Sequence, residues 1–107
     1  MSEDRSARAV RLGLIEIKSQ LDQLDPAWQY RAATQAESDA LHATFVMADF
    51  ESAFAFMTRV AQLAHELDHH PEWSNVYNRV QITLRTHDAG GVTGLDFEMA
   101  QRIDQLI

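Results

Sequence analysis

The sequence contains no cysteine, so neither disulfide bonds nor thiolate chemistry can contribute to its fold or activity. It has only 2 prolines and 4 glycines, and no Pro/Gly-rich linker, repeat or low-complexity tract divides its 107 residues. A chain of this length suffices for one compact domain and is too short for two. We therefore expect a single domain over residues 1–107, held by a packed core and helped, where that core is insufficient, by a subunit interface.

Basic side chains are also scarce, because 9 Lys and Arg stand against 16 Asp and Glu, a net charge of −7. A negative field repels phosphate backbones and disfavours binding to nucleic acid. No apolar run approaches the roughly 20 residues that span a bilayer. The N-terminal MSEDRSARAV is charged and lacks the apolar stretch of a signal peptide. The expectation is a cytoplasmic protein with neither a nucleic-acid nor a membrane partner.

Three stretches with helical periodicity predict helices over residues 1–24, 49–69 and 93–106. The first has a stripe at alternating steps of four and three, and Asp25-Pro26 ends it: Val10, Leu14, Ile17, Leu21, Leu24. The second begins at Asp49 as N-cap, stops at Pro71 and has a broad apolar face: Phe50, Ala53, Phe54, Met57, Val60, Ala61, Ala64, Leu67. The third has Thr93 as N-cap and Asp96 in its first turn, where the helix dipole favours a negative charge.

Segments with a period of two predict strands. Residues 28–32 and 41–47 alternate apolar and polar side chains on either side of the polar stretch 34–39, as in a hairpin. A second β-rich segment runs from about Asn75 to Thr86, with 75–78 as an extra short strand and 88–91 as a turn. The order α-β-β-α-β-β-α predicts an α+β fold, in which an antiparallel sheet of about four strands carries helices on one face.

Four of the five histidines fall in two places: His65, His69 and His70 near the end of the second helix, and His87 at the end of a strand. Imidazole titrates near neutrality, so such a cluster suits proton transfer or metal ligation, although solvated surface histidines are the common alternative.

Residues 65–69 also match H-E-x-x-H, the zinc-peptidase pattern of two histidines one helical turn apart beside a glutamate base. Pro71 stops the predicted helix directly afterwards, and the chain is small for a cleft around a helical zinc site. Neither Asp88 nor Glu98 is marked as a third ligand. We therefore expect no metal.

A longer pattern accounts for the same histidines. The stretch HELDHHPEWSNVYNRVQITLRTHDAGGVTGLD resembles the signature of the pterin-4a-carbinolamine dehydratases, a His-His-Pro followed by an aromatic residue, a further His and an Asp. The positions that match this signature are His65, His69, His70, Pro71, Tyr77, His87 and Asp96. Upstream, FVMADFESAFAFMTRVA and the segment around Trp28 are similar to the family as well, so the resemblance covers roughly residues 21–106.

The resemblance implies a 4a-hydroxytetrahydrobiopterin dehydratase that converts a 4a-hydroxytetrahydropterin to quinonoid dihydropterin and water, without metal or cofactor, in tetrahydrobiopterin recycling. It implies His69, His70 and His87 as catalytic residues and a pterin site made of Asp68, His69, His70, Pro71, Arg85, Thr86, His87 and Asp88. Trp73 and Tyr77 are candidates for the pocket wall, with core packing as the alternative. A homo-oligomer, dimer or tetramer, and an aromatic amino-acid hydroxylase in the same pathway are the implied partners. The alternative function is a dimerisation cofactor or scaffold without catalysis.

Three features depart from the family pattern. The loop over 35–39 is longer than usual, Met47 stands where a phenylalanine is common, and Arg85 replaces a small residue before the Thr-His pair. The first two are expected to lie away from the site, whereas Arg85 is expected to affect how the substrate is bound.

Overall fold

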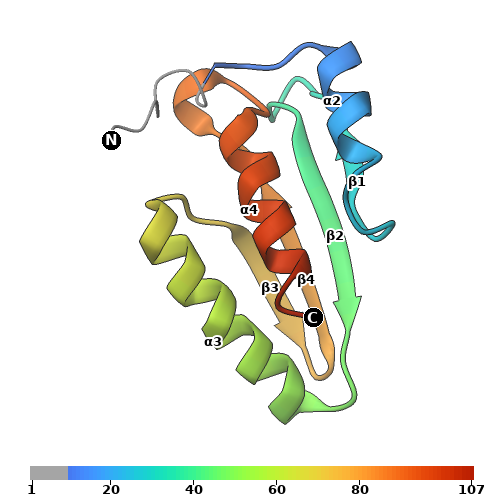
Figure 1. Cartoon of the computed structure of the whole chain (residues 1–107), viewed down its shortest axis with the longest axis vertical. Helices are drawn as coiled ribbons and strands as arrows, with labels where there is room; N and C mark the ends of the chain where they lie inside the picture. The colour runs from blue at the N-terminus through green and yellow to red at the C-terminus, as the bar shows by residue number, and fades with distance from the viewer. Residues whose placement is uncertain (1–9) are drawn as a thin grey trace.

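The structure is a computed structural model that describes residues 10–107 (Figure 1). Its elements follow the predicted α+β order: α2 (Leu14–Leu21), β1 (Gln29–Arg31), β2 (Ala40–Val46), α3 (Phe50–Leu67), β3 (Glu72–Val76), β4 (Arg79–Leu84), a 3₁₀ turn η1 (His87–Ala89) and α4 (Gly94–Asp104). None of the helices within residues 10–107 has the length and apolar character that a membrane span requires.

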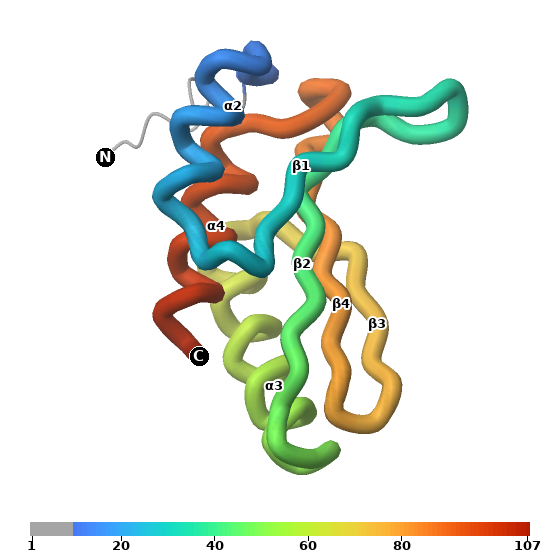
Figure 2. Tube along the Cα trace, turned by 90° about the vertical axis from the view of Figure 1, so that its right-hand side faces the viewer, coloured from blue at the N-terminus to red at the C-terminus, as the bar shows by residue number. Residues whose placement is uncertain are grey.

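The strands form one antiparallel sheet in the order β1-β2-β4-β3, and the helices lie on one of its faces (Figure 2). Alternate residues of the two central strands pair across the sheet, as in Ala43 with Ile82 and Phe45 with Val80, and face the helices. Phe45 also meets Trp28 edge-on and Phe56 at a tilt, with ring centroids 5.8 and 5.4 Å apart. This layered arrangement confirms the predicted fold class.

The helix α3 begins at its predicted N-cap, because the Asp49 carboxylate accepts a hydrogen bond from Ser52 N at 2.7 Å. That backbone hydrogen bond lowers the pKa of Asp49. The helix ends at Leu67 rather than at residue 69, since Asp68 adopts a left-handed conformation with φ of 51° and turns the chain.

The predicted apolar face of this helix is wrong in part. Phe50 and Phe54 are 46% and 58% exposed and stack on each other, whereas Phe56 and Leu63, which the pattern left out, are buried in the core. A run of closely spaced apolar residues contains more than one helical stripe, and packing against the sheet selects among them.

The N-terminal helix is shorter than predicted. Its proposed first nine residues lie outside the described part of the chain, and residues 10–13 are not helical. Instead Arg11 forms an isolated bridge with Thr93, and Leu12 N donates to Val92 O at 2.9 Å. The helix α2 therefore starts at Leu14 and ends at Leu21, before the Asp25-Pro26 pair.

The second hairpin also differs from the prediction. The extra strand covers Glu72–Val76 rather than 75–78, and residues 77–78 form the tight turn to β4. Tyr77 has a φ of 51° there and is 63% exposed. Since β3 starts directly after Pro71, the His-His-Pro segment is held between the end of α3 and an edge strand.

Candidate functional site

A cavity of about 280 Å³ lies where the end of α3, the end of β4, η1 and the first turn of α4 converge. Its lining residues are Asp68, His69, His70, Arg85, Thr86, His87, Asp88 and Leu95. The structure thus brings together all the predicted site residues except Pro71, which is not part of the lining. It adds Leu95, an apolar residue that the sequence pattern placed only in a helical stripe.

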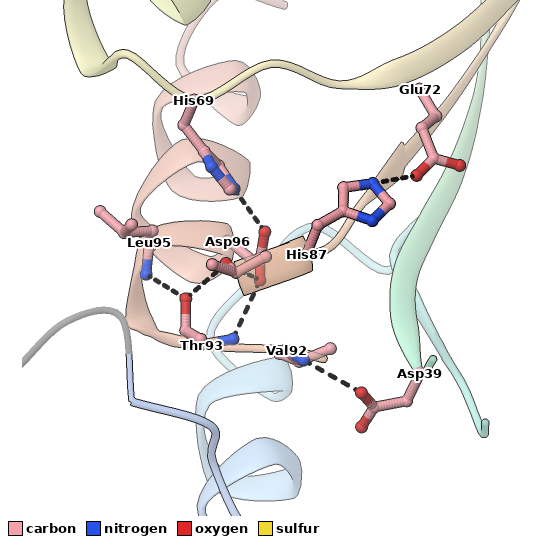
Figure 3. A network of polar contacts seen from close by, with 9 residues as sticks. Asp39, His69, Glu72, His87, Val92, Thr93, Leu95 and Asp96 are labelled. Carbon is pink, nitrogen blue, oxygen red and sulfur yellow. Dashed lines mark hydrogen bonds and ion pairs between the residues drawn. The ribbon is translucent and has the colours of Figure 1, made fainter. Parts of the chain in front are cut away.

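His69 lies beyond the end of α3, in the turn that Asp68 creates. Its backbone N donates to Ala64 O at 3.0 Å, and its side chain is buried with Nε2 2.6 Å from Asp96 Oδ1 (Figure 3). The prediction of a helix that includes residue 69 is therefore wrong at its end, and the His69 ring is buried rather than solvated. His65 remains on α3 and is exposed, so the two histidines do not form the one-turn pair that an H-E-x-x-H zinc site needs.

Asp96 is fully buried in the first turn of α4 and is the centre of a hydrogen-bond network. Its Oδ2 accepts from Thr93 N at 2.9 Å and from Thr86 Oγ1 at 3.0 Å (Figure 3). Thr86 and Thr93 share a further hydrogen bond of 2.7 Å, and Thr93 Oγ1 accepts from Leu95 N. The same carboxylate therefore caps the helix and orients His69.

The contact between His69 and Asp96 determines which imidazole nitrogen is free to react. A carboxylate only accepts hydrogen bonds, so Nε2 of His69 must carry the proton. In the neutral ring Nδ1 is then the unprotonated nitrogen. His69 can thus accept a proton only at Nδ1, and its orientation is fixed by a group 27 residues away in sequence.

His87 has a different environment. It begins η1, its side chain is 73% exposed, and its Nε2 lies 3.1 Å from Glu72 Oε2 on β3 (Figure 3). Glu72 also accepts from Arg85 Nη1 at 3.3 Å through both carboxylate oxygens. Sequence reasoning did not single out Glu72. A residue that follows Pro71 at the start of a strand gives no sign that its side chain will reach a histidine beyond the next strand.

A second buried carboxylate holds the loop that carries His87 and Asp88. Asp39, 1% exposed, accepts from Val92 N at 3.0 Å (Figure 3) and from the Tyr30 hydroxyl at 2.6 Å. Burial and the contact with Asp39 raise the pKa of Tyr30 to about 12, so its hydroxyl stays a donor. The sequence placed Asp39 only at the end of a polar loop, and nothing in its immediate neighbours marks this role.

The remaining candidates lie outside the cavity lining. Tyr77 is in the β3–β4 turn, at the opposite end of the sheet (Figure 1), and Trp73 is partly buried against the core. Core packing is therefore the better interpretation of Trp73. His42 is buried on β2, with Nδ1 2.9 Å from Thr83 Oγ1.

Arg85 and the unusual loop, two of the three departures from the family pattern, meet in space. Arg85 Nη1 lies 3.6 Å from Glu37 Oε2 in that loop, which projects on the helix-free side of the sheet (Figure 2). The loop was expected to lie away from the site, and this expectation is wrong. Since Arg85 also lines the cavity, the two departures act on the site together.

The fold and site define a small α+β domain in which three histidines line one cavity and two of them, His69 and His87, are paired with a carboxylate, an arrangement suited to proton transfer. The family model of pterin 4 alpha carbinolamine dehydratase matches residues 11–106, and the chain belongs to this family.

Relatives and a solved structure agree with this assignment. The chain is 56% identical over 68 residues to a "Putative pterin-4-alpha-carbinolamine dehydratase" of Jannaschia sp. (strain CCS1), covering 64% of this chain and 69% of that protein. It is 53% identical over 87 residues to a protein of the same name from Rhizorhabdus wittichii, covering 79% and 86%. A crystal structure of a transcriptional coactivator/pterin dehydratase from Brucella melitensis superposes with a TM-score of 0.81 at 43% identity, over 90% of this chain and 97% of that one.

Proposed function

We propose that this protein dehydrates 4a-hydroxytetrahydropterins to quinonoid dihydropterins. The observation that carries the proposal is the convergence of His69, His70 and His87 on one cavity, together with carboxylates that fix two of the three rings. Membership of the dehydratase family and the names of the relatives support the same reaction.

The reaction requires two proton transfers. One proton goes to the departing 4a-hydroxyl group as the C–O bond breaks, and one leaves the adjacent ring nitrogen as the C=N bond forms. Two imidazoles can supply both steps near neutral pH, and each positioned group typically contributes about 10²–10⁴-fold to the rate. The atoms balance without a redox partner, and the two imidazoles account for both proton transfers, so the proposal needs neither a redox cofactor nor a metal.

We assign the proton transfers to His70 and His87, which are exposed at the cavity and lie in separate segments, His70 before β3 and His87 after β4. His69 is assigned a supporting part, because its ring is buried and held by Asp96, whereas the rings of His70 and His87 are exposed at the cavity. Asp68, Arg85, Thr86 and Asp88 line the remaining wall and are proposed to bind the pterin, and Pro71 is proposed to fix the backbone next to His70.

The cellular context is also part of the proposal. The reaction follows an aromatic amino-acid hydroxylase, which would place the protein in tetrahydrobiopterin recycling in the cytoplasm. A homo-oligomer, dimer or tetramer, is expected because a domain of this size buries only about 60–65% of the surface of its unfolded chain. The exposed Phe50–Phe54 stack is consistent with an interface. Sedimentation that shows only monomer at micromolar concentration would contradict this expectation.

A second candidate is a protein-binding role as a dimerisation cofactor. It is favoured by one observation, the similarity to the Brucella melitensis protein that is named a transcriptional coactivator as well as a pterin dehydratase. The histidine–carboxylate pairs favour the enzyme, since a scaffold has no need of them.

The test is dehydration of a 4a-hydroxytetrahydropterin by the purified, chelator-treated protein. The proposal expects a rate well above that of the uncatalysed reaction. If chelation abolishes activity and zinc restores it, the metal-free mechanism is wrong. If no dehydration occurs with or without zinc, the function itself is wrong.

A further inference from the structure

His87 poses a problem for catalysis, because a side chain that is 73% exposed can rotate freely and lose the geometry that proton transfer needs. The only hydrogen bond that the described residues give its ring is the one from Nε2 to Glu72 Oε2, at 3.1 Å (Figure 3). The position of this ring therefore depends on how firmly Glu72 is itself held.

Glu72 is held from two sides. Its backbone is the first residue of β3 and pairs with Thr83 on β4. Its carboxylate accepts from Arg85 Nη1 through both oxygens, each at 3.3 Å. The strand pairing and the contact with Arg85 restrict the rotamers of Glu72, whose side chain is 44% exposed, so less rotamer freedom is lost when it binds His87.

Arg85 needs these carboxylates. Its side chain is only 8% exposed, and its Nε is buried without a hydrogen-bond partner among the described residues. A buried guanidinium must be paired to avoid a large desolvation cost, and here the pairing groups are Glu72 and Glu37. The pairing with the buried Arg85 guanidinium thus holds the Glu72 carboxylate within hydrogen-bond distance of His87.

We propose that Glu72 is the positioning residue of His87: it accepts the Nε2 proton, fixes the ring and leaves Nδ1 as the nitrogen that exchanges a proton with the substrate. This rests on the proposed dehydratase function. The arrangement repeats that of His69 and Asp96, because in both pairs a carboxylate takes the Nε2 proton. Both histidines therefore offer Nδ1 to the reaction.

The experiment compares Glu72→Ala, Glu72→Gln and a matched control, Glu66→Gln, in the full-length protein. Glu66 is an exposed carboxylate on α3 with one long contact, 3.9 Å from Arg102, and it does not line the cavity. Glu72→Ala should lower kcat by about 10–100-fold with KM changed less than about threefold, by analogy with the loss of a carboxylate that orients a metal-bound imidazole. Glu72→Gln should recover most of kcat, because its amide oxygen still accepts from Nε2. Glu66→Gln should match the wild type.

The second readout is the tautomer of His87, measured by ¹⁵N NMR of the imidazole nitrogens in the ligand-free protein at a pH where the ring is neutral. The wild type and Glu72→Gln should carry the proton on Nε2, and Glu72→Ala should show a mixture of tautomers. Unchanged kcat in Glu72→Ala, a rise in KM alone, or a loss of kcat with the wild-type tautomer retained would each overturn the proposal.

Folding and function remain separable in this design. If Glu72→Ala does not fold because Arg85 is left unpaired, Glu72→Asp takes its place. The shorter carboxylate should still pair with Arg85 but should no longer reach Nε2 of His87, so the same loss of kcat and the same mixture of tautomers are expected. If the wild type itself shows no dehydration, the proposed function fails, whereas the NMR comparison still decides whether Glu72 holds the ring.

Discussion

Asp96→Asn tests how the buried network controls His69. Asp96 receives three hydrogen bonds, from His69 Nε2 at 2.6 Å, Thr93 N at 2.9 Å and Thr86 Oγ1 at 3.0 Å. Asparagine can keep its oxygen toward the two threonines, which places its NH₂ group against Nε2 of His69. Because both groups would then be donors, His69 must move its proton to Nδ1, the nitrogen through which it is proposed to support the reaction.

The magnitudes follow from this exchange. Three charge-assisted hydrogen bonds, each worth about 1.5–3 kcal/mol, become neutral ones worth about 0.5–1.5 kcal/mol each, so the free energy of unfolding should fall by up to about 3–4 kcal/mol, and removal of a buried charge recovers part of this loss. Turnover should fall by roughly 10–100-fold, because an imidazole in the wrong tautomer contributes little acid–base catalysis.

The assay combines steady-state kinetics, urea denaturation and ¹⁵N NMR of His69. The matched control is Asp104→Asn, on the same helix, where the carboxylate accepts from Asp25 N and Trp28 Nε1 away from the cavity. It should lower stability and leave kcat per folded molecule unchanged. If Asp96→Asn keeps the wild-type kcat, or loses kcat while His69 keeps its proton on Nε2, the reasoning is refuted.

Three further changes test other parts of the structure. Phe56→Ala should cost about 3–5 kcal/mol in urea denaturation, because the ring is 1% exposed; a loss below about 1 kcal/mol would contradict the core assignment. Gly91→Ala should lower both Tm and kcat, since its Cβ would clash with the Asp39 carboxylate and displace the loop that carries His87 and Asp88. An unchanged kcat would argue that the contact between Asp39 and Val92 does not position this loop. Burial, and then the charge of Arg31, lower the pKa of His42 below 6.5, so acidification below that value weakens folding through this group. His42→Gln should reduce the fall in stability between pH 7 and 5 and leave kcat unchanged, and an identical pH profile would contradict it.

The elements that the sequence predicts well are those with a local cause. Asp49 and Thr93 are N-caps as expected, because capping depends on residues within three positions. The order of helices and strands along the chain follows from helical and alternating apolar periodicity, whereas the order of the strands in the sheet was not predicted. The local pattern fails where hydrogen bonds to a segment distant in sequence determine the backbone. Residues 10–13 are an example, because they pair with the segment before α4 instead of extending the helix.

The site is predicted only in part for the same reason. The His-His-Pro signature and the Thr-His pair identify most of the residues that line the cavity. The partners of the histidines are not local: Asp96 and Glu72 lie 27 and 15 residues from the rings that they hold. A left-handed residue at Asp68 and the register of an edge strand create both contacts, and neither leaves a pattern that can be recognised in the sequence.

The central claim is that the cavity histidines carry out the dehydration. The most direct test is the single-turnover rate of 4a-hydroxytetrahydropterin dehydration by His70→Ala, His87→Ala and His42→Ala beside the wild type, with circular dichroism to confirm folding. The account predicts that the first two variants lose about 10²-fold or more and that His42→Ala, whose ring hydrogen-bonds Thr83 outside the cavity lining, keeps the wild-type rate. Near-normal rates in both His70→Ala and His87→Ala, or equal damage from His42→Ala and His87→Ala, would contradict it.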